Sequence, residues 1–229
     1  MITLKALGHA CFILDTGNHS IIFDPWLSEN PEAAISADEV SVDAVLPSHG
    51  HSDHLGDTID IARRLDVPII GPYELCMYCQ RQGVEVIPMH IGGGRQFDFG
   101  HVQLTLALHG SAVITEDLIE YTGPACGFII TVGDTTVYYA GDTGIFGDMA
   151  LIGEMNSIDV AVLPIGDNFT MGPDSAVRAA QMLGAKSVVP MHYSAFDVIE
   201  QDPHAFADRL AELGIDCAVL KPGEQMDVS

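Results

Sequence analysis

Four residues that can bind a metal ion stand close together in the segment LPSHGHSDHLGD, residues 46–57. They are His49, His51, Asp53 and His54. At the end of an extended strand His49 and His51 would project to the same side, while Asp53 and His54 continue into a turn. Imidazole and carboxylate ligands suit zinc, iron or manganese, whereas a calcium loop would use oxygen alone. The spacing therefore predicts a metal site that can supply ligands to two adjacent ions.

Three further candidate ligands follow apolar runs elsewhere in the chain. His109 follows HVQLTLAL, Asp142 follows YYAG and His192 follows VVPM. Taken singly, each would more often be a hydrogen-bonded structural residue. Catalytic residues favour strand ends and the loops after them, so three such residues at the ends of apolar strands favour a site shared with the first four.

Strand-like and helix-like segments alternate along the chain. ITLKAL, CFILD and SIIFDP predict an antiparallel meander, because turn residues separate them. HVQLTLAL alternates apolar and other residues as a half-buried strand does. GFIITV and TVYYAG predict a hairpin that turns at Gly133 and Asp134. The other expected elements are strands at 43–49, 68–71, 85–89, 159–165, 187–192 and 217–222, helices at 57–65, 73–82, 173–183 and 203–213, and a polar loop at 110–124.

This order of elements predicts a single α/β (α+β) domain over residues 1–229. Antiparallel strands followed by β-α alternation indicate two sheets with helices outside them. A chain of 229 residues can bury one sizeable core and needs no second domain.

Charge and composition narrow the choice of partners. Nine Lys plus Arg against 32 Asp plus Glu give a formal net charge of −23, which repels polyanions and disfavours nucleic acid. No apolar stretch is long and uninterrupted enough to predict a membrane span. Five cysteines, an odd and scattered set, favour a reducing cytoplasm over a disulfide framework. A small-molecule substrate is the expected partner.

The whole pattern resembles the metallo-β-lactamase superfamily, whose signature His-x-His-x-Asp-His stands here at residues 49–54. In detail the chain looks like the predicted metal-dependent hydrolases allied to L-ascorbate-6-phosphate lactonase. The segments that fit this group are GHACFIL, IIFDPW, GHSDHLGD, ALHGS, YYAGDTG, LPIGDNFTMG and VVPMHY. The resemblance spans nearly the whole chain and implies a four-layer αβ/βα sandwich, with metals in a cleft at the edge between the sheets.

The resemblance also implies which side chains would hold two divalent ions. The implied ligands of the first ion are His49, His51 and His109, those of the second are Asp53, His54 and His192, and Asp142 would bridge the two. Zinc is the expected ion, with manganese and iron as alternatives. The residues expected beside the ligands or along the pocket are His9, Asp24, Asp167 and Asn168.

Two such ions would make hydrolysis the expected reaction. Metal ions lower the pKa of bound water and polarise a substrate oxygen, so a metal-bridging hydroxide can attack an ester, lactone or phosphoester of a small molecule. Asp53 is the expected catalytic residue, as a ligand that also orients the attacking water.

Several other functions stay open at this point. A phosphodiesterase or nuclease of the same fold would use similar ligands, although the acidic chain disfavours it. Redox chemistry by a single-iron thiol dioxygenase is a further alternative, and a diiron oxidoreductase would be expected to use Glu where His51 stands. A non-catalytic metal-binding or ligand-sensing module is the alternative from another class. Residues 27–41 and 110–124 are expected to shape the pocket. The oligomeric state is open, with a homo-oligomer as one possibility because related proteins often self-associate.

Overall fold

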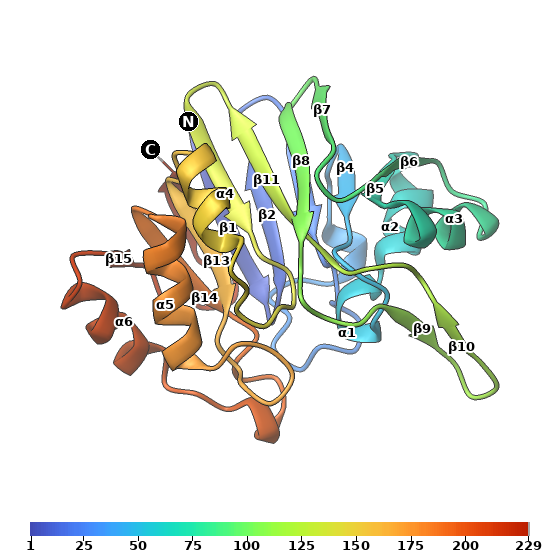
Figure 1. Cartoon of the computed structure of the whole chain (residues 1–229). Helices are drawn as coiled ribbons and strands as arrows, with labels where there is room; N and C mark the ends of the chain where they lie inside the picture. Colours follow the sequence, from blue (N-terminus) through green and yellow to red (C-terminus); the bar gives the residue numbers. More distant parts are fainter. Residues whose placement is uncertain (229) are drawn as a thin grey trace.

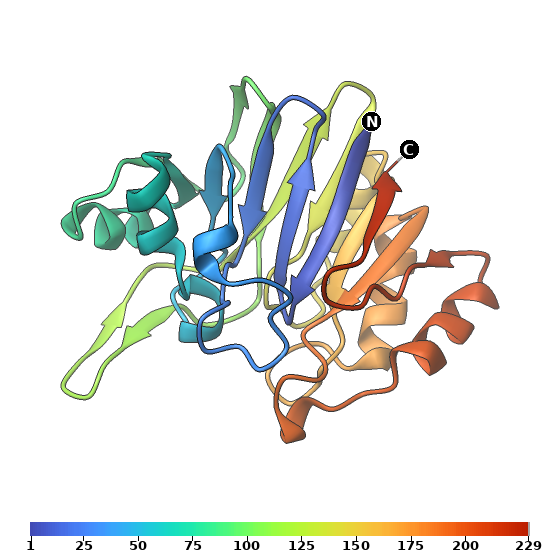
Figure 2. The same ribbon diagram turned by 180° about the vertical axis from the view of Figure 1, so that it is seen from behind.

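Two seven-stranded β-sheets lie face to face, and helices cover both outer faces. The computed structural model describes residues 1–228. Figures 1 and 2 show α2 and α3 on one flank and α4, α5 and α6 on the other, so the layers run helix, sheet, sheet, helix. The expected two-sheet α/β fold with outer helices is confirmed.

The first sheet is built mainly from the N-terminal part of the chain, in the order β16-β1-β2-β3-β4-β5-β6. Its first three sequential strands form the expected antiparallel meander, and the next three join in parallel. The strands are β1 (Ile2–Gly8), β2 (Cys11–Asp15), β3 (Ser20–Phe23), β4 (Ala44–Leu46), β5 (Ile69–Pro72), β6 (Val86–Met89) and β16 (Gln225–Val228). The helices of this half are η1 (Ala37–Glu39), α1 (Ser52–Leu55), α2 (Thr58–Leu65) and α3 (Tyr73–Arg81).

The second sheet has the order β15-β14-β13-β12-β11-β8-β7. Strands β11 and β12 form the expected hairpin around Gly133 and Asp134, and β12, β13 and β14 run parallel. The strands are β7 (Gly94–Phe97), β8 (Gly100–Leu106), β11 (Cys126–Val132), β12 (Thr135–Tyr139), β13 (Val160–Pro164), β14 (Ser187–Met191) and β15 (Asp216–Cys217). The helices are α4 (Met149–Met155), α5 (Pro173–Leu183), η2 (Asp197–Ile199) and α6 (Pro203–Ala211).

Local signals set the bounds of the two longest helices on this flank. Helix α5 begins with Pro173, whose missing N–H costs nothing at the first helical position, and ends at Gly184 in the left-handed conformation. In α6 the side chain of Asp202 accepts hydrogen bonds from the first free backbone amides, those of His204 and Ala205. These caps explain why the helices begin within a residue of the predicted positions.

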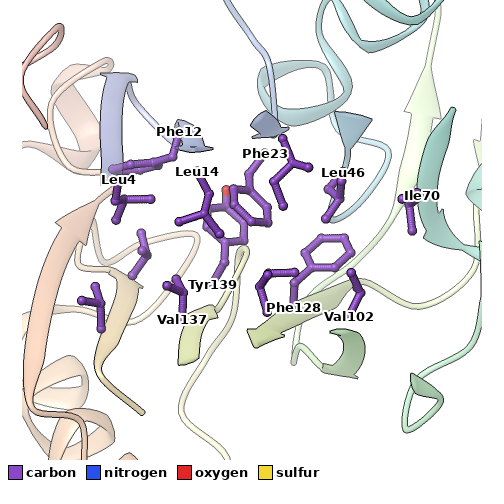
Figure 3. Close-up of a cluster of buried hydrophobic side chains, with 14 of the residues drawn as sticks. Leu4, Phe12, Leu14, Phe23, Leu46, Ile70, Val102, Phe128, Val137 and Tyr139 are labelled. Atoms are coloured by element: carbon purple, nitrogen blue, oxygen red, sulfur yellow. The ribbon is translucent and has the colours of Figure 1, made fainter. Parts of the chain in front are cut away.

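The main core lies between the two sheets (Figure 3). Leu14 and Phe23 on the first sheet meet Phe128 and Tyr139 on the second, and the rings of Phe23 and Tyr139 stack with centroids 4.6 Å apart. Separate apolar layers lie under α2 and α3 and under α4 to α6. Each fully buried side chain of this size contributes roughly 1.5–3 kcal/mol by leaving water, so the three layers hold the strand ends in fixed positions.

The directions of the strands bring many strand ends to one edge of the sandwich. Strands β1 and β3 are both antiparallel to β2, and β4 is parallel to β3, so these three end at the same edge of the first sheet. In the second sheet β8 and β12 are both antiparallel to β11, and β13 and β14 follow β12. Figure 1 shows β1 and β8 pointing towards the same edge, where the connecting loops gather.

Several elements differ from the expectations. The segment 110–124 is not a loop throughout, since it carries the hairpin of β9 (Ala112–Ile114) and β10 (Ile119–Tyr121), which extends away from the body (Figure 1). The strand expected at 217–222 was also wrong in extent. Only Asp216–Cys217 pairs as β15, because the chain then turns at Lys221 to Glu224 towards β16. Strands of two or three residues have too few positions for a periodicity to be recognised.

The sequence did not predict helix α4 or the two edge strands β7 and β16. No helix within residues 1–228 is long and apolar enough to cross a membrane.

Candidate metal centre

The candidate residues outside residues 49–54 stand immediately or shortly after strands that end at the shared edge. His9 follows β1, Asp24 follows β3, His109 follows β8, Asp142 follows β12 and His192 follows β14. His49 lies three residues beyond β4, and Asp53 and His54 lie on the single turn of α1. The alternation of the sheets thus delivers side chains from both halves of the chain to one place.

The backbone at these strand ends is held in an uncommon conformation. Among residues 1–228, six non-glycine residues have positive φ, and five of them were named as site candidates from the sequence: His9, Asp24, Asp167, Asn168 and His192. The left-handed region is costly for residues with a Cβ, and such residues gather where function requires a particular side-chain direction. The strain therefore marks this edge as the functional edge.

Two glycines allow the close turns that place the ligands. Gly141, with φ +60°, precedes Asp142, and a Cβ there would lie 2.6 Å from the carbonyl oxygen of Cys126. A Cβ on Gly166 would lie 2.1 Å from the carbonyl oxygen of His192. Neither contact is tolerable, so both positions require glycine.

Three imidazoles form the first group of candidate ligands. The Nδ1 atom of His51 lies 2.9 Å from Nε2 of His49 and 3.3 Å from Nε2 of His109. Neighbouring nitrogens around a tetrahedral zinc ion at about 2.05 Å would lie roughly 3.3 Å apart. The spacing of the three nitrogens fits a single ion with an open fourth position.

A second group faces the first across Asp142. Oδ2 of Asp53 lies 3.7 Å from Nε2 of His54 and 3.6 Å from Nε2 of His192. Oδ2 of Asp142 lies 3.3 Å from Nε2 of His54, 3.2 Å from Nε2 of His192 and 3.6 Å from Nε2 of His109. Asp142 therefore contacts members of both groups, as a bridging carboxylate would.

Asp24 organises the side of this site that faces the core. Its carboxylate, fully buried, accepts hydrogen bonds from the backbone N–H of Ser48 at 2.6 Å, the hydroxyl of Ser48 at 2.6 Å, the hydroxyl of Tyr139 at 2.7 Å and Nδ1 of His54 at 2.7 Å. With four donors already bound, Asp24 supports the site from behind and is not itself a ligand. Carboxylates behind metal-binding histidines orient the ring and raise its basicity.

This network fixes the tautomers of two rings. His54 donates its Nδ1 proton to Asp24, so in the neutral ring, which is the form that binds a metal, the lone pair is on Nε2 and faces the cluster. The single hydroxyl proton of Ser48 goes to Asp24, so at the 2.9 Å contact with Nδ1 of His49 the serine oxygen accepts. His49 then carries its proton on Nδ1 and likewise presents Nε2 to the cluster.

His9 lies beside the second group of candidate ligands. Its Nε2 lies 3.2 Å from Oδ2 of Asp53, and a ligand atom of His9 falls within 4.8 Å of those of Asp53, His54 and His192. Burial lowers the pKa of His9 to about 4, although the hydrogen bond to Asp53 opposes this. His9 is therefore a neutral ring at physiological pH and can donate a hydrogen bond to Asp53.

Carboxylates dominate the electrostatics of the second group. Burial would lower the pKa of His192, but the carboxylates of Asp142 and Asp53 together outweigh burial and raise it to about 9. Burial opposes the charged form of His54 too, but Asp142, Asp53 and Asp24 together raise its pKa well above the usual value. Without metal, protons on two rings thus supply the positive charge that the carboxylates require.

Asp142 and Asp53 are ionised because positively charged histidines lie beside them. Burial alone would raise the pKa of Asp142, but the positive charges of His54 and His192 hold it well below its usual range. The pKa of Asp53 is lowered in the same way, against burial, mainly by His54. In the first group burial lowers the pKa of His49, His51 and His109, so these rings are neutral and ready to bind an ion.

Unpartnered atoms test whether the site fits divalent ions. Within residues 1–228, Nε2 of His54 and Oδ1 of Asp142 are buried and make no hydrogen bond. Buried polar atoms without partners are rare in proteins, because each loses its contact with water. Nε2 of His54 lies 3.3 Å from Oδ2 of Asp142 within the cluster, and both unpartnered atoms are ligand types of zinc, manganese and iron, so the residues fit divalent ions.

A cleft of about 620 Å³ opens over these groups. The cluster residues on its surface are His51, Asp53, His109, Asp142 and His192. The remaining lining residues are Trp26, Glu29, Ser52, Phe169, Phe196 and Val198. The rings of Trp26 and Phe196 stack with centroids 5.6 Å apart, and the edge of each meets His9.

The loops that shape the cleft were only partly foreseen. Residues 27–41 contribute Glu29, and Val113 and Ile114 of β9 line an adjoining hollow of about 310 Å³ that shares Trp26 with the cleft. The turn after β13 lines the cleft through Phe169 and not through Asp167 or Asn168, which are exposed and lie outside the lining. Positive φ at both residues turns the chain so that the next side chain enters the cleft.

Some functional residues gave little signal in the sequence. Ser48 and Tyr139 hold Asp24, and only their places beside His49 and before Asp142 pointed to them. Phe196 and Val198 come from the turn around η2, which carries no motif.

The fold and this cluster agree with comparisons to known proteins. Residues 19–193 match the family model described as Beta-lactamase superfamily domain. The chain is 53% identical over 222 residues to a UPF0173 metal-dependent hydrolase of Bacillus licheniformis, covering 96% of each protein. It is 49% identical over 223 residues to one from Bacillus cereus, again covering 96% of each.

Solved structures show the same fold. Igni18, a metallo hydrolase from the hyperthermophilic archaeon Ignicoccus hospitalis, superposes with a TM-score of 0.90 at 33% identity, covering 98% of this chain and 97% of that one. An isothiocyanate hydrolase from Delia radicum gut bacteria shares the fold at a TM-score of 0.77 and 23% identity, covering 99% of each chain.

The chain belongs to the metallo-β-lactamase superfamily, and within it to the UPF0173 metal-dependent hydrolases. Its relatives are metal-dependent hydrolases, and its own His and Asp clusters agree with the use of a divalent metal.

Proposed function

We propose that the chain hydrolyses an ester, lactone or phosphoester bond of a small molecule with a pair of divalent ions, zinc first among the candidates. The contact of Asp142 with both ligand groups carries this proposal, because one carboxylate oxygen lies 3.2–3.6 Å from histidines of each. His49, His51 and His109 would hold one ion; Asp53, His54 and His192 would hold the other. A lactone of the kind the sequence resemblance indicates is one member of this class.

The residues of the chain divide the chemical tasks between them. A bound divalent ion lowers the pKa of water to about 7 and polarises the substrate oxygen. Asp53 is the carboxylate that can meet the attacking water, since 22% of its side chain is exposed against 3% for Asp142. The lowered pKa of Asp53 keeps it an acceptor at neutral pH, and the His9 ring holds its orientation.

Asp24 and Ser48 act as positioning residues. They hold the protons of His54 and His49 on Nδ1 and so keep both Nε2 lone pairs directed at the cluster. Both residues are buried and neither lines the cleft, so they act on the site only through the two histidines.

The competing functions have less support. The net charge of −23 repels nucleic acid, and none of the cleft-lining residues is Lys or Arg.

The five cysteines are all free thiols, which supports a reducing compartment such as the cytoplasm. Self-association stays a prediction.

Turnover by the metal-loaded protein tests the proposal. Protein stripped of metal and then reloaded with zinc or manganese should hydrolyse members of a panel of 4-nitrophenyl esters, lactones and phosphoesters, and the stripped protein should not. A folded, reloaded protein that binds two ions and hydrolyses no member of the panel would support the ligand-sensing alternative instead.

A further inference from the structure

The candidate ligands form the floor of the cleft, and the other lining residues form its wall, which differs from the floor in chemistry. Beyond the cluster residues the lining consists of four apolar side chains, Trp26, Phe169, Phe196 and Val198, together with Glu29 and Ser52. Phe169 and Val198 are 54% and 56% exposed and line the same cleft, and apolar side chains gathered along a groove are typical of a ligand-binding surface. A part of the substrate that covered them would bury this apolar surface.

The wall also lacks a cation that could receive an anionic substrate group. The chain has nine Lys plus Arg, and none of them lines the cleft or the adjoining hollow. Four of the nine are engaged elsewhere in ion pairs: Arg63 with Asp60, Arg81 with Glu120, Lys186 with Asp159 and Arg209 with Asp174. The one charged group on the wall is the carboxylate of Glu29, which repels anions.

From these observations we infer that the substrate is an uncharged ester or lactone whose acyl or alkyl group is apolar, and that Phe169, Phe196, Val198 and Trp26 select it. This inference rests on the proposed function and narrows it. It places phosphorylated lactones outside the preferred class, because a phosphate beyond the scissile bond would lose water and meet no partner. The scissile carbonyl would lie over the cluster and the apolar group along the wall.

Matched substrates test the inference. The hexanoate and the acetate of 4-nitrophenol differ by four methylenes, and the mono-4-nitrophenyl ester of adipic acid has the length of the hexanoate but ends in a carboxylate. We expect kcat/KM for the hexanoate to exceed that for the acetate at least about tenfold, since each buried methylene contributes about 0.8 kcal/mol. The adipate ester should fall below the hexanoate by at least about tenfold as well.

Variants of the two exposed residues locate the effect on the wall. Phe169→Ala and Val198→Ala should each lower the ratio of hexanoate to acetate turnover about three- to tenfold. Val198→Lys should raise the ratio of adipate to hexanoate turnover, because it supplies the missing cation. Leu151→Ala removes a side chain of similar exposure (52%) on α4, which does not line the cleft, and serves as the matched control.

Binding can be followed without turnover, because Trp26 is the single tryptophan of the chain and lies on the wall. The non-hydrolysable ketone 2-nonanone should shift Trp26 fluorescence at lower concentration than 2-butanone, and Phe169→Ala should weaken the shift. Glucose 6-phosphate should cause no comparable shift in the metal-free protein.

The outcomes separate the two claims. If the esters are hydrolysed with no dependence on chain length, or the adipate ester or a phosphorylated lactone is preferred, the inference is wrong while the hydrolase proposal stands. If 2-nonanone binds as expected but no ester is hydrolysed, the apolar selectivity stands and the proposed hydrolysis fails. If 2-nonanone and 2-butanone bind alike and Phe169→Ala has no effect, the inference is overturned whatever the turnover.

Discussion

The floor and the wall of the cleft follow opposite physical rules. The floor, the cluster of His49, His51, Asp53, His54, His109, Asp142 and His192, is polar, largely buried and held by strained strand ends. The wall is mainly apolar, because it carries Trp26, Phe169, Phe196 and Val198 beside Glu29 and Ser52. Three of the four apolar side chains are exposed on turns. A buried polar floor is stable only when its groups have partners, whereas an exposed apolar wall gains only when a ligand covers it. The difference indicates that the floor performs the reaction and the wall chooses the substrate.

The largest effect is expected on the floor, at Asp142. Asp142→Asn removes the negative charge that contacts both ligand groups, so kcat/KM should fall by at least about three orders of magnitude and metal content should fall with it. Asp134→Asn makes the same chemical change at an exposed hairpin turn and should leave both values within about twofold. Full activity in Asp142→Asn would show that the floor does not work as one unit.

Loss of support behind the floor should have a smaller effect. Asp24→Asn keeps the shape of the side chain but leaves His54 without its anionic partner, so affinity for zinc should fall about 10- to 100-fold. Competition with a chromophoric chelator measures this affinity. Tyr139→Phe removes one of the four donors to Asp24 and should lower the affinity less. An unchanged affinity in both variants would mean that Asp24 serves the core alone.

The pH dependence of the metal-free protein separates the floor from the rest of the molecule. The folded-state pKa of His192 is raised to about 9 from the ordinary 6.5, so its contribution to stability is fully present below pH 6.5 and is lost as pH rises through 9. The Tm of the chelator-treated protein should therefore fall between pH 6.5 and 9. His192→Asn should flatten this fall, and His204→Asn, at an exposed position of α6, should not.

His9 supplies the opposite sign in the same titration. Its folded-state pKa is lowered to about 4, so the unfolded chain takes up a proton that the folded chain does not as pH falls below 6.5. Stability of the metal-free protein should decrease from pH 6.5 towards pH 4, and His9→Asn should reduce that decrease. A Tm with the same acid slope in His9→Asn would exclude His9 as its source.

The smallest effects are expected on the wall. Phe196→Ala removes a ring that stacks on Trp26 and should lower turnover of long acyl substrates about tenfold, with little change in metal content. Measuring zinc content beside kcat/KM distinguishes this loss from damage to the floor. A loss of metal in Phe196→Ala would show that wall and floor are coupled.

The same contrast explains how much the sequence could predict. The residues of the floor could be predicted because four of them fall within residues 49–54 and the others follow strongly apolar strands. Both the spacing of the residues and the pattern of the strands before them therefore indicated the site. The parallel strands could be predicted as short apolar runs bounded by turn residues, and β8 could be predicted from its alternation. The helix caps at Pro173 and Asp202 are local signals as well.

The wall depended on information that no short window contains. Phe169, Phe196 and Val198 lie on irregular turns after β13 and β14, where no period links a residue to its neighbours in space. The role of Asp24 became visible only when β3, β4 and β12 brought Ser48, His54 and Tyr139 around it. The hairpin of β9 and β10 was missed because three-residue strands are shorter than the roughly four to eight residues over which an alternation is recognised.

The central claim is that side chains from both sheets enclose a pair of divalent ions. A crystal structure of the zinc-loaded protein, with anomalous scattering measured on both sides of the zinc edge, tests it most directly. Two zinc peaks are expected in the floor, one against His49, His51 and His109 and one against Asp53, His54 and His192, with Asp142 contacting both. A single peak, or peaks that His109, Asp142 and His192 do not contact, would contradict it.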